Sequence, residues 1–385
     1  MLAIKNGNII TVTKGMIKQG TILIDDGKIV KVGQNIEVPE KAEVIDATDK
    51  YVMPGLIDAH TNIGLKEGSL RWEGMDHVEK TEAVVPQLRP IDGINPFDVA
   101  IKDAVANGIT STLIAPGDDN TIGGVGSVFK LRGITADQMF IKDACVKVAL
   151  GENAKNIFNR KKMPSTRMGT AYLLRKAFYD AKQYEKDLEE KKSNNDKKIK
   201  RDLKSEVLLK VLNHELPLHV HAHRADDIMT AIRIAKEFEI DMVLVHGYEA
   251  DKVAKELNKN NVAVIYGPIF NSRTQVETAN LNMKTPKLLK EANVELALTT
   301  AHPAKPIAIL PTCAALAIRE GLDVCTAINA ITITPAKLLG VDDRVGSIEE
   351  GKDADIVIFN GHPLQIISNV EKTIIDGEVV YSIEE

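Results

Sequence analysis

The pattern of apolar and polar positions changes twice along the chain. Near the N-terminus, apolar and polar residues alternate in LAIKNGNIITV, TILIDDGKIVKVG and AEVIDATDKYVMPG, around NG and DG turn signals. The last forty residues repeat this pattern in DADIVIFNG and VEKTIIDGEVVYS. Alternation with a period of two predicts half-buried strands. We therefore expect residues 1–53 and 346–385 to form one composite β-sandwich domain built from both termini.

Between these ends, residues 54–345 alternate continuous apolar runs with amphipathic helical patterns. The apolar runs are GLIDAH, GITSTLIAPG, GSVFKLRG, CVKVALGE, LPLHVHAH, DMVLVHG, VAVIYGP and ELALTTA, of which GSVFKLRG is the least strand-like. Strands of this kind joined by helices are typical of a parallel sheet buried on both faces. About eight such units predict a closed (β/α)8 TIM-like barrel. A doubly wound open sheet is the structural alternative, but no GxGxxG follows the early strands.

The segment from Tyr184 to Val207 is dense in charges of both signs. Such a composition is typical of a solvated helix or a mobile insertion. We assign it no function.

Composition narrows the class of protein. The 385 residues are 44% hydrophobic and 27% charged, as in an ordinary globular protein, and the net charge of -5 argues against nucleic acid or an anionic membrane as the main partner. No apolar run approaches the length of roughly 18–20 residues that a membrane span needs. The first residues lack the apolar core of a signal peptide, and Cys145, Cys313 and Cys325 form no CxxC pair. We therefore expect a cytoplasmic protein with free thiols, none of them a nucleophile.

The polar residues that could carry chemistry lie at the ends of the predicted barrel strands. Six of the nine histidines fall there, although histidine is scarce in the chain: His60, His219, His221, His223, His246 and His302. Glu152 follows the fourth predicted strand. Barrel enzymes place their active sites at the carboxyl ends of the strands. Imidazole and carboxylate are ligands that suit zinc, iron or a similar divalent ion, whose bound water becomes a nucleophile near neutral pH.

With these residues in place, the sequence resembles the amidohydrolase superfamily, and within it the imidazolonepropionase-like amidohydrolases. The resemblance covers nearly the whole chain. It rests on KYVMPGLIDAHTN at the barrel entry, on LHVHAHRADDI and VLVHG in the middle, and on ITPAKLLGVDDRVGSIEEGKDADIVIFNG near the end. It implies a metal-dependent hydrolase barrel with a β domain assembled from both termini.

The family pattern assigns roles to several strand-end residues. The first strand offers His-x-His, which corresponds here to His60 and Asn62. A middle strand offers a carboxylated lysine or a glutamate, and Glu152 resembles the glutamate version. Histidines end the fifth and sixth strands, and they correspond to His221 (with His219 and His223 as less favoured choices) and to His246.

Two positions depart from the family pattern. An aspartate normally ends the eighth strand, where it binds metal and moves the proton from metal-bound water to the leaving amine. Ala301 stands at this position and can neither bind a metal nor move a proton. Asn62 offers only a neutral amide oxygen where an imidazole is expected, which makes it a weak ligand for zinc. The remaining set predicts at most one divalent metal, zinc before iron or manganese, or none. In the absence of the aspartate, His223 or His302 would have to act as the base.

The functional readings follow from this partial site. The first is hydrolysis of a C–N bond in a small cyclic amide, amidine or N-acyl compound. The alternative is a catalytically impaired homologue that binds a small molecule or has a regulatory role, and a third is isomerisation or deamination in the same pocket. His223 and Arg273 are the candidate substrate contacts, and the Gly-rich loop APGDDNTIGGVGS is either a substrate loop or a flexible connection. The sequence leaves open whether the chain forms a homo-oligomer.

Overall fold

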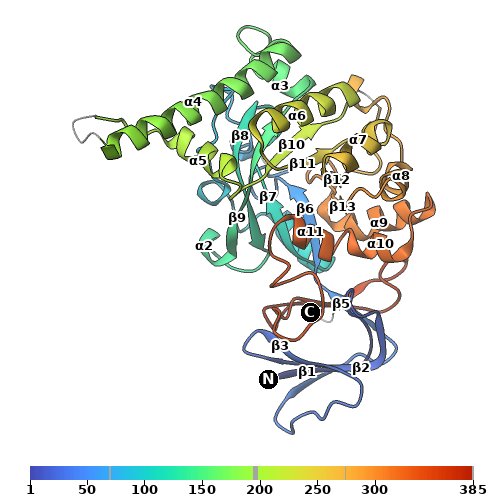
Figure 1. The fold of residues 1–385 in the computed structure, drawn as a ribbon. Helices are drawn as coiled ribbons and strands as arrows, with labels where there is room; N and C mark the ends of the chain where they lie inside the picture. The colour runs from blue at the N-terminus through green and yellow to red at the C-terminus, as the bar shows by residue number, and fades with distance from the viewer. Residues whose placement is uncertain (69–70, 194–197, 274, 384–385) are drawn as a thin grey trace.

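A computed structural model describes residues 1–68, 71–193, 198–273 and 275–383, and within them two eight-stranded sheets (Figure 1). The first sheet contains strands from both ends of the chain. Its order is β16-β15-β14-β5-β1-β2-β3, with β4 paired to β1. Its strands are β1 (Leu2–Ile10), β2 (Met16–Asp25), β3 (Lys28–Gly33), β4 (Glu43–Asp46), β5 (Tyr51–Pro54), β14 (Ile356–Phe359), β15 (Val370–Ile375) and β16 (Glu378–Ser382).

The two ends of the chain therefore share one hydrogen-bonded sheet, joined where β5 pairs antiparallel with β14. The two DG signals form the β2–β3 and β15–β16 hairpins. The NG signal at Asn6-Gly7 does not form a turn: β1 continues through it with an irregular register. A Cβ on Gly7 would lie 2.7 Å from Val52, so a glycine allows the close approach of β5. The sandwich form and the domain limits at 53/54 and 345/346 stay predictions.

The second sheet is the barrel, with strand order β13-β12-β11-β10-β9-β8-β7-β6. Its strands are β6 (Leu56–Thr61), β7 (Ile109–Ile114), β8 (Ile122–Lys130), β9 (Phe140–Ala149), β10 (Leu218–Ala222), β11 (Met242–His246), β12 (Ala263–Tyr266) and β13 (Leu296–Leu298). The helices around it are α1 (Val99–Ala106), α2 (Ala136–Met139), α3 (Glu152–Asn156), α4 (Arg167–Ser193), α5 (Leu203–Leu212), α6 (Ala225–Phe238), α7 (Ala254–Lys259), α8 (Thr285–Glu291), α9 (Leu310–Arg319), α10 (Val324–Asn329) and α11 (Ile333–Leu338).

The barrel departs from the expected all-parallel plan at its third strand. β8 runs antiparallel to both β7 and β9. The reason is the length of the connections, since residues 115–121 join β7 to β8 and residues 131–139 join β8 to β9. A parallel crossover needs a dozen or more residues, usually with a helix, so these short links permit only hairpins. GSVFKLRG is thus a barrel strand, but a reversed one.

The first and last barrel strands meet through a buried hydrogen-bond cluster. Thr299 and Thr300 donate their hydroxyls to the carboxylate of Asp58 at 2.5 and 2.6 Å, and the backbone N–H of Asn62 donates to the carbonyl of His302 at 2.8 Å. Asp58 is fully buried, and burial raises its pKa. The cluster links β6 to the segment after β13, where the two strands do not pair as a ladder.

A second buried polar cluster joins the barrel to the terminal sheet. Because β8 is reversed, its last residue, Lys130, lies at the barrel end that faces the terminal sheet. The Lys130 ammonium is 2.8 Å from the carboxylate of Asp353 and 2.9 Å from that of Asp355, and it also pairs with Asp376. Lys130 is only 4% exposed and Asp353 and Asp355 are also buried, so these two ion pairs are shielded from water.

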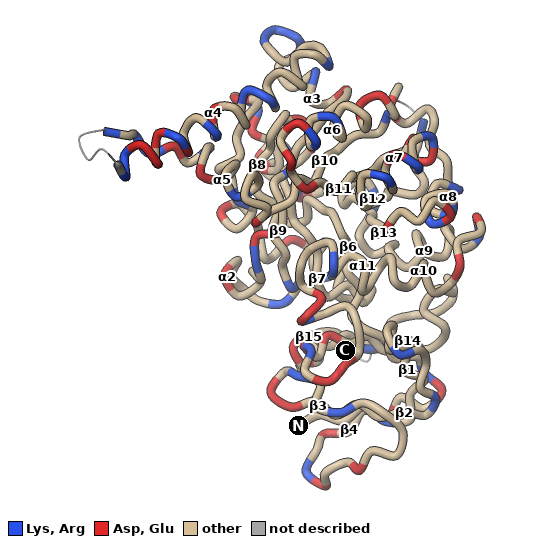
Figure 2. The backbone as a smooth tube through the Cα atoms, viewed as in Figure 1, with Lys and Arg blue, Asp and Glu red and all other residues tan. Residues whose placement is uncertain are grey.

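The charge-dense segment forms the end of α4 and the start of α5, and both signs alternate along α4 (Figure 2). α4 extends away from the barrel (Figure 1). Residues 194–197 of this segment lie outside the described residues. No described helix combines the length and the apolar character that crossing a bilayer would require.

Candidate functional site

The candidate site begins at the carboxyl end of β6, a strand buried along its whole length. His60 is 3% exposed and its ring lies 5.5 Å from that of His246, edge to face. Asn62 does not aim its amide at these rings: its Nδ2 donates to the carbonyl of Ala115 at 2.8 Å. This bond ties the end of β6 to the end of β7.

The strands β10 and β11 contribute the other histidines. His221 lies between His223 and His246, with ring centroids 4.7 and 4.8 Å away. His223 stacks on Tyr248 at 4.3 Å. The Nδ1 of His246 faces the carbonyl oxygen of Gly267 at 2.6 Å. A carbonyl only accepts, so Nδ1 carries the proton and Nε2 presents its lone pair to the site.

A carboxylate and a lysine lie among these histidines. Asp118, in the β7–β8 loop, places Oδ1 2.5 Å from the Lys147 ammonium and 3.1 Å from Nδ1 of His221. Its Oδ2 is 3.6 Å from Nε2 of His246. Lys147 is fully buried in β9 and is aligned with His219 on β10. These contacts join strands β9, β10 and β11 to the loop that follows β7.

The electrostatics favour neutral imidazoles and an ionised carboxylate. Burial lowers the pKa of His221 to about 4 and that of His219 to about 3, and it holds the pKa of His60 well below the usual range. Burial alone would raise the pKa of Asp118, but the charges of His221 and Lys147 hold it well below its ordinary value. A neutral imidazole with a free lone pair is the form that binds a metal.

The donor set fits a divalent metal. Among the described residues, one ligand atom from each of His60, Asp118 and His246 lies within 4.8 Å of the others, and the same holds for His221, His223 and Glu277. Nδ1 of His60 and Nε2 of His221 are buried without a hydrogen-bond partner in the described structure. Buried polar atoms are normally satisfied, so unpaired nitrogens converging with a carboxylate indicate a site built for a cation.

Glu277 is less available as a ligand than this proximity suggests. Its carboxylate accepts the backbone N–H of Glu152 at 2.6 Å and lies 3.5 Å from Arg167. Burial raises the pKa of Glu277 to about 7. It belongs to the short turn Val276–Thr278, which supports the start of α3.

Three of the predicted site residues make no contact with the histidine cluster. Glu152 is the first residue of α3, and the described residues that line the central cavity do not include it. Arg273 is exposed and donates to the carbonyl of Leu281. His302 is buried, but its Nδ1 accepts the N–H of Ile307. The roles predicted for Glu152, Arg273 and His302 therefore stay predictions without a contact to the cluster.

Ala301 lines the cavity but adopts the left-handed backbone conformation, with φ of 52°. Only glycine, asparagine and aspartate visit this region readily. The backbone at position 301 is thus well suited to the aspartate that the family pattern places there, although the residue is an alanine.

Sequence reasoning missed Asp118 and Lys147. Lys147 had a signal: it is a charged residue inside the otherwise apolar strand KVALGE, on the same face as Cys145 and Ala149. Asp118 had a weaker one, because DD in a Gly-rich loop is ordinary turn chemistry. The family pattern offers a carboxylated lysine or a glutamate in a middle strand, and the structure brings Lys147, rather than Glu152, to the histidines.

The cavity at this site has a volume of about 240 Å³. Besides the histidines it is lined by Lys66 and His77 and by the amide side chains of Asn153, Asn271 and Gln275. Burial lowers the pKa of His77 to about 4. The space and its polar lining suit a small polar molecule.

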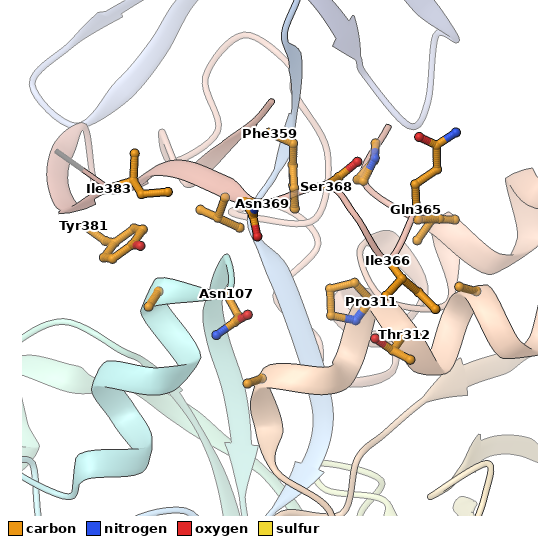
Figure 3. Close-up of a pocket in the computed structure, with 16 residues that line it drawn as sticks. Asn107, Pro311, Thr312, Phe359, Gln365, Ile366, Ser368, Asn369, Tyr381 and Ile383 are labelled. Carbon is orange, nitrogen blue, oxygen red and sulfur yellow. The ribbon is translucent and has the colours of Figure 1, made fainter. Parts of the chain in front are cut away.

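A different hollow, of about 310 Å³, lies between α1, α9 and the terminal sheet (Figure 3). Asn107 and Thr312 approach it from the two helices, and Tyr381 and Phe359 from the sheet. Its described lining contains no histidine, cysteine, acidic or basic residue. It therefore lacks the groups that acid–base or metal chemistry needs.

The comparisons with known proteins agree with this geometry. The amidohydrolase family profile matches residues 51–380. The crystal structure of an amidohydrolase from Thermotoga maritima MSB8 is similar at 43% identity with a TM-score of 0.96, over 99% of this chain and 100% of that one. The amidohydrolase tasK of Hapsidospora irregularis is 28% identical over 93% of this chain. The imidazolonepropionase of Staphylococcus aureus strain JH9 is 40% identical over 17% of this chain.

This chain spans 39% of the length of tasK, and the imidazolonepropionase match covers 18% of that protein. The family match, in contrast, includes the barrel and, of the terminal sheet, β5, β14, β15 and part of β16. Together with the strand-end histidines, it shows that the chain belongs to the amidohydrolase family.

Proposed function

We propose that this chain hydrolyses a C–N bond in a small cyclic amide, amidine or N-acyl compound, at a centre that holds one divalent metal. The observation that carries the proposal is the convergence of three buried histidines: the ring of His246 lies 5.5 Å from that of His60 and 4.8 Å from that of His221. Relatives named D-hydantoinase, dihydroorotase and imidazolonepropionase match parts of the chain and suggest the substrate class.

The residues present favour one metal over two. Asn62 is engaged with the carbonyl of Ala115, and Ala301 offers only a methyl group. His60, His221 and His246 would hold the metal, with zinc preferred over iron or manganese for this nitrogen-rich set. When bound, a divalent metal supplies Lewis acidity that makes water a nucleophile near neutral pH.

The chain's own groups would do the rest of the work. Burial keeps the imidazoles neutral and excludes bulk water. The amides of Asn153 and Asn271 can donate to and accept from a small polar substrate in the cavity. Of the two predicted bases, His223 borders the cavity and His302 does not, so we assign proton transfer to His223.

A catalytically impaired, small-molecule-binding homologue is the second candidate function. Ala301 favours it, because loss of a general base typically costs about 10²–10⁴ in rate. A small-molecule partner and a cytoplasmic location are parts of the proposal, which leaves the oligomeric state open.

The test measures metal content and hydrolysis together. The purified full chain is analysed for Zn, Fe and Mn and assayed on hydantoins, dihydroorotate, an imidazolone and N-acyl amino acids, with and without added metal. His246→Asn should abolish both metal retention and activity. His214→Asn is the matched control, because His214 is exposed and pairs with Asp241 away from the site. A metal-free protein that stays silent on every substrate after metal loading would exclude the hydrolase and favour the binding function.

A further inference from the structure

The site lacks the eighth-strand carboxylate, yet a different carboxylate occupies its middle. Asp118 contacts Lys147, His221 and His246, which belong to three successive barrel strands. We propose that Asp118 is the carboxylate ligand of the metal centre, in place of the residue missing at Ala301, and that Lys147 holds it in position. The inference rests on the one-metal centre of the proposed function and adds a ligand from a new position in the fold.

The loop after the second strand brings Asp118 to the centre. Loops that follow barrel strands build the active-site mouth, and in an all-parallel barrel this one would lead on into a helix on the barrel surface. Here residues 115–121 form a hairpin loop between β7 and β8 at the carboxyl end of β7. Asp118 is the middle residue of that loop, so its side chain is presented at the mouth of the barrel, where it lines the cavity together with Ala301.

The loop is anchored on both sides of Asp118. The backbone N–H of Gly117 donates to the carbonyl of His77 at 2.7 Å, and the Asn120 side chain donates to the carbonyl of Glu79 at 2.7 Å. A Cβ at Gly117 would lie 2.8 Å from the His77 ring, so the close contact requires glycine. A ligand held in this way is positioned before the metal binds, which lowers the entropic cost of binding.

The two carboxylate oxygens of Asp118 face different partners. Oδ1 lies against the ammonium of Lys147, which is fully buried and needs a counter-charge. Oδ2 faces Nε2 of His246, and one oxygen of Asp118 shares a common 4.8 Å neighbourhood with ligand atoms of His60 and His246. Lys147 thus fixes Oδ1, which also lies 3.1 Å from Nδ1 of His221, while Oδ2 points at His246. Ala301, which lines the same cavity, contributes only a methyl group there.

The experiment moves the carboxylate and measures metal affinity. Zn²⁺ and Mn²⁺ are titrated into metal-free full-length protein against a competing chromophoric chelator. Changes to groups that only support a metal ligand already cost about 10–100-fold, so Asp118→Asn should weaken binding by at least about 100-fold. The double variant Asp118→Asn plus Ala301→Asp should recover most of that loss, because the left-handed backbone at 301 accommodates aspartate. Asp137→Asn is the control: it neutralises an exposed carboxylate of α2 that is not among the residues lining the cavity, and it should leave the affinity unchanged.

Each outcome has a defined meaning. Loss in Asp118→Asn with recovery in the double variant supports the relocated ligand, even if every substrate assay is silent and the hydrolase proposal fails. Unchanged affinity in Asp118→Asn overturns the inference while leaving hydrolysis by the histidine centre intact. Loss without recovery also overturns it, because Asp118 then acts on the fold and not as an exchangeable ligand; circular dichroism of the metal-free variants provides the folding check. A wild-type protein that binds neither metal overturns both proposals.

Discussion

Replacing Lys130 by methionine removes the cation on which the junction between barrel and terminal sheet depends. Its ammonium lies 2.8 Å from Asp353 and 2.9 Å from Asp355 and also pairs with Asp376, while the side chain is almost fully buried. Asp353 retains Lys28 and Arg344 after the change. Asp355 retains no cation among the described residues, so its burial becomes uncompensated.

The size of the stability loss depends on how many cations Asp353 and Asp355 keep. Breaking a buried ion pair by removing one partner costs about 3–5 kcal/mol. Because Asp353 keeps two partners, we expect the lower end of the range, about 3 kcal/mol of unfolding free energy at pH 7.5.

The deficit should depend on pH with a definite sign. Burial raises the pKa of Asp355 to about 6 even with Lys130 present, and removing Lys130 raises it further. A carboxyl group whose folded pKa exceeds its unfolded pKa costs stability above the folded value, and the cost disappears as the pH falls through it. The pKa of Asp353 is lowered, so the stability that its ion pairs contribute is lost only when the pH falls below the ordinary pKa of an aspartate. Between pH 7.5 and pH 5, the deficit of Lys130→Met should therefore shrink.

Urea unfolding followed by far-UV circular dichroism at both pH values measures this. Lys31→Met, a change at an exposed lysine of β3, is the control and should stay within about 0.5 kcal/mol of the wild type. A Lys130→Met protein as stable as the wild type at pH 7.5, or one whose deficit grows at pH 5, would refute the reasoning.

Two further changes probe the barrel itself. Gly151→Ala should lower the unfolding free energy by about 2 kcal/mol or more, because φ is +95° and the new Cβ would lie 2.3 Å from Oε1 of Glu277. Gly351→Ala is the control: φ is +90° but the space around it is open, so it should cost only the backbone strain of about 1 kcal/mol. Equal shifts in melting temperature for the two variants would contradict the clash with Glu277. Thr299→Val keeps the side-chain shape but removes the hydroxyl that donates to buried Asp58, so chemical unfolding should show a loss of about 1–3 kcal/mol; a neutral result would mean that the seam between β6 and β13 does not depend on this bond.

Much of the fold can be predicted from the sequence because the relevant signals are local. Period-two alternation at both ends marks the strands that the structure joins into one sheet, and the continuous apolar runs mark the barrel strands. The positions of His60, His221 and His246 follow in the same way, since a residue at the end of a buried strand lies at the barrel mouth whatever its partners are. The departures from the family pattern at Asn62 and Ala301 can also be recognised from the identity of each residue.

What only the tertiary structure decided depends on strand direction and on which face of a strand a residue occupies. β8 is buried along its whole length, so its apolar run resembles that of a parallel strand and could not reveal its reversal. That reversal carries Lys130 to the terminal sheet and makes the β7–β8 loop a hairpin over the mouth. Lys147 and Glu152 are five residues apart, and only the packed barrel turns Lys147 inward to meet Asp118. Long-range contacts of this kind arise from the closure of the sheet, which no local pattern encodes.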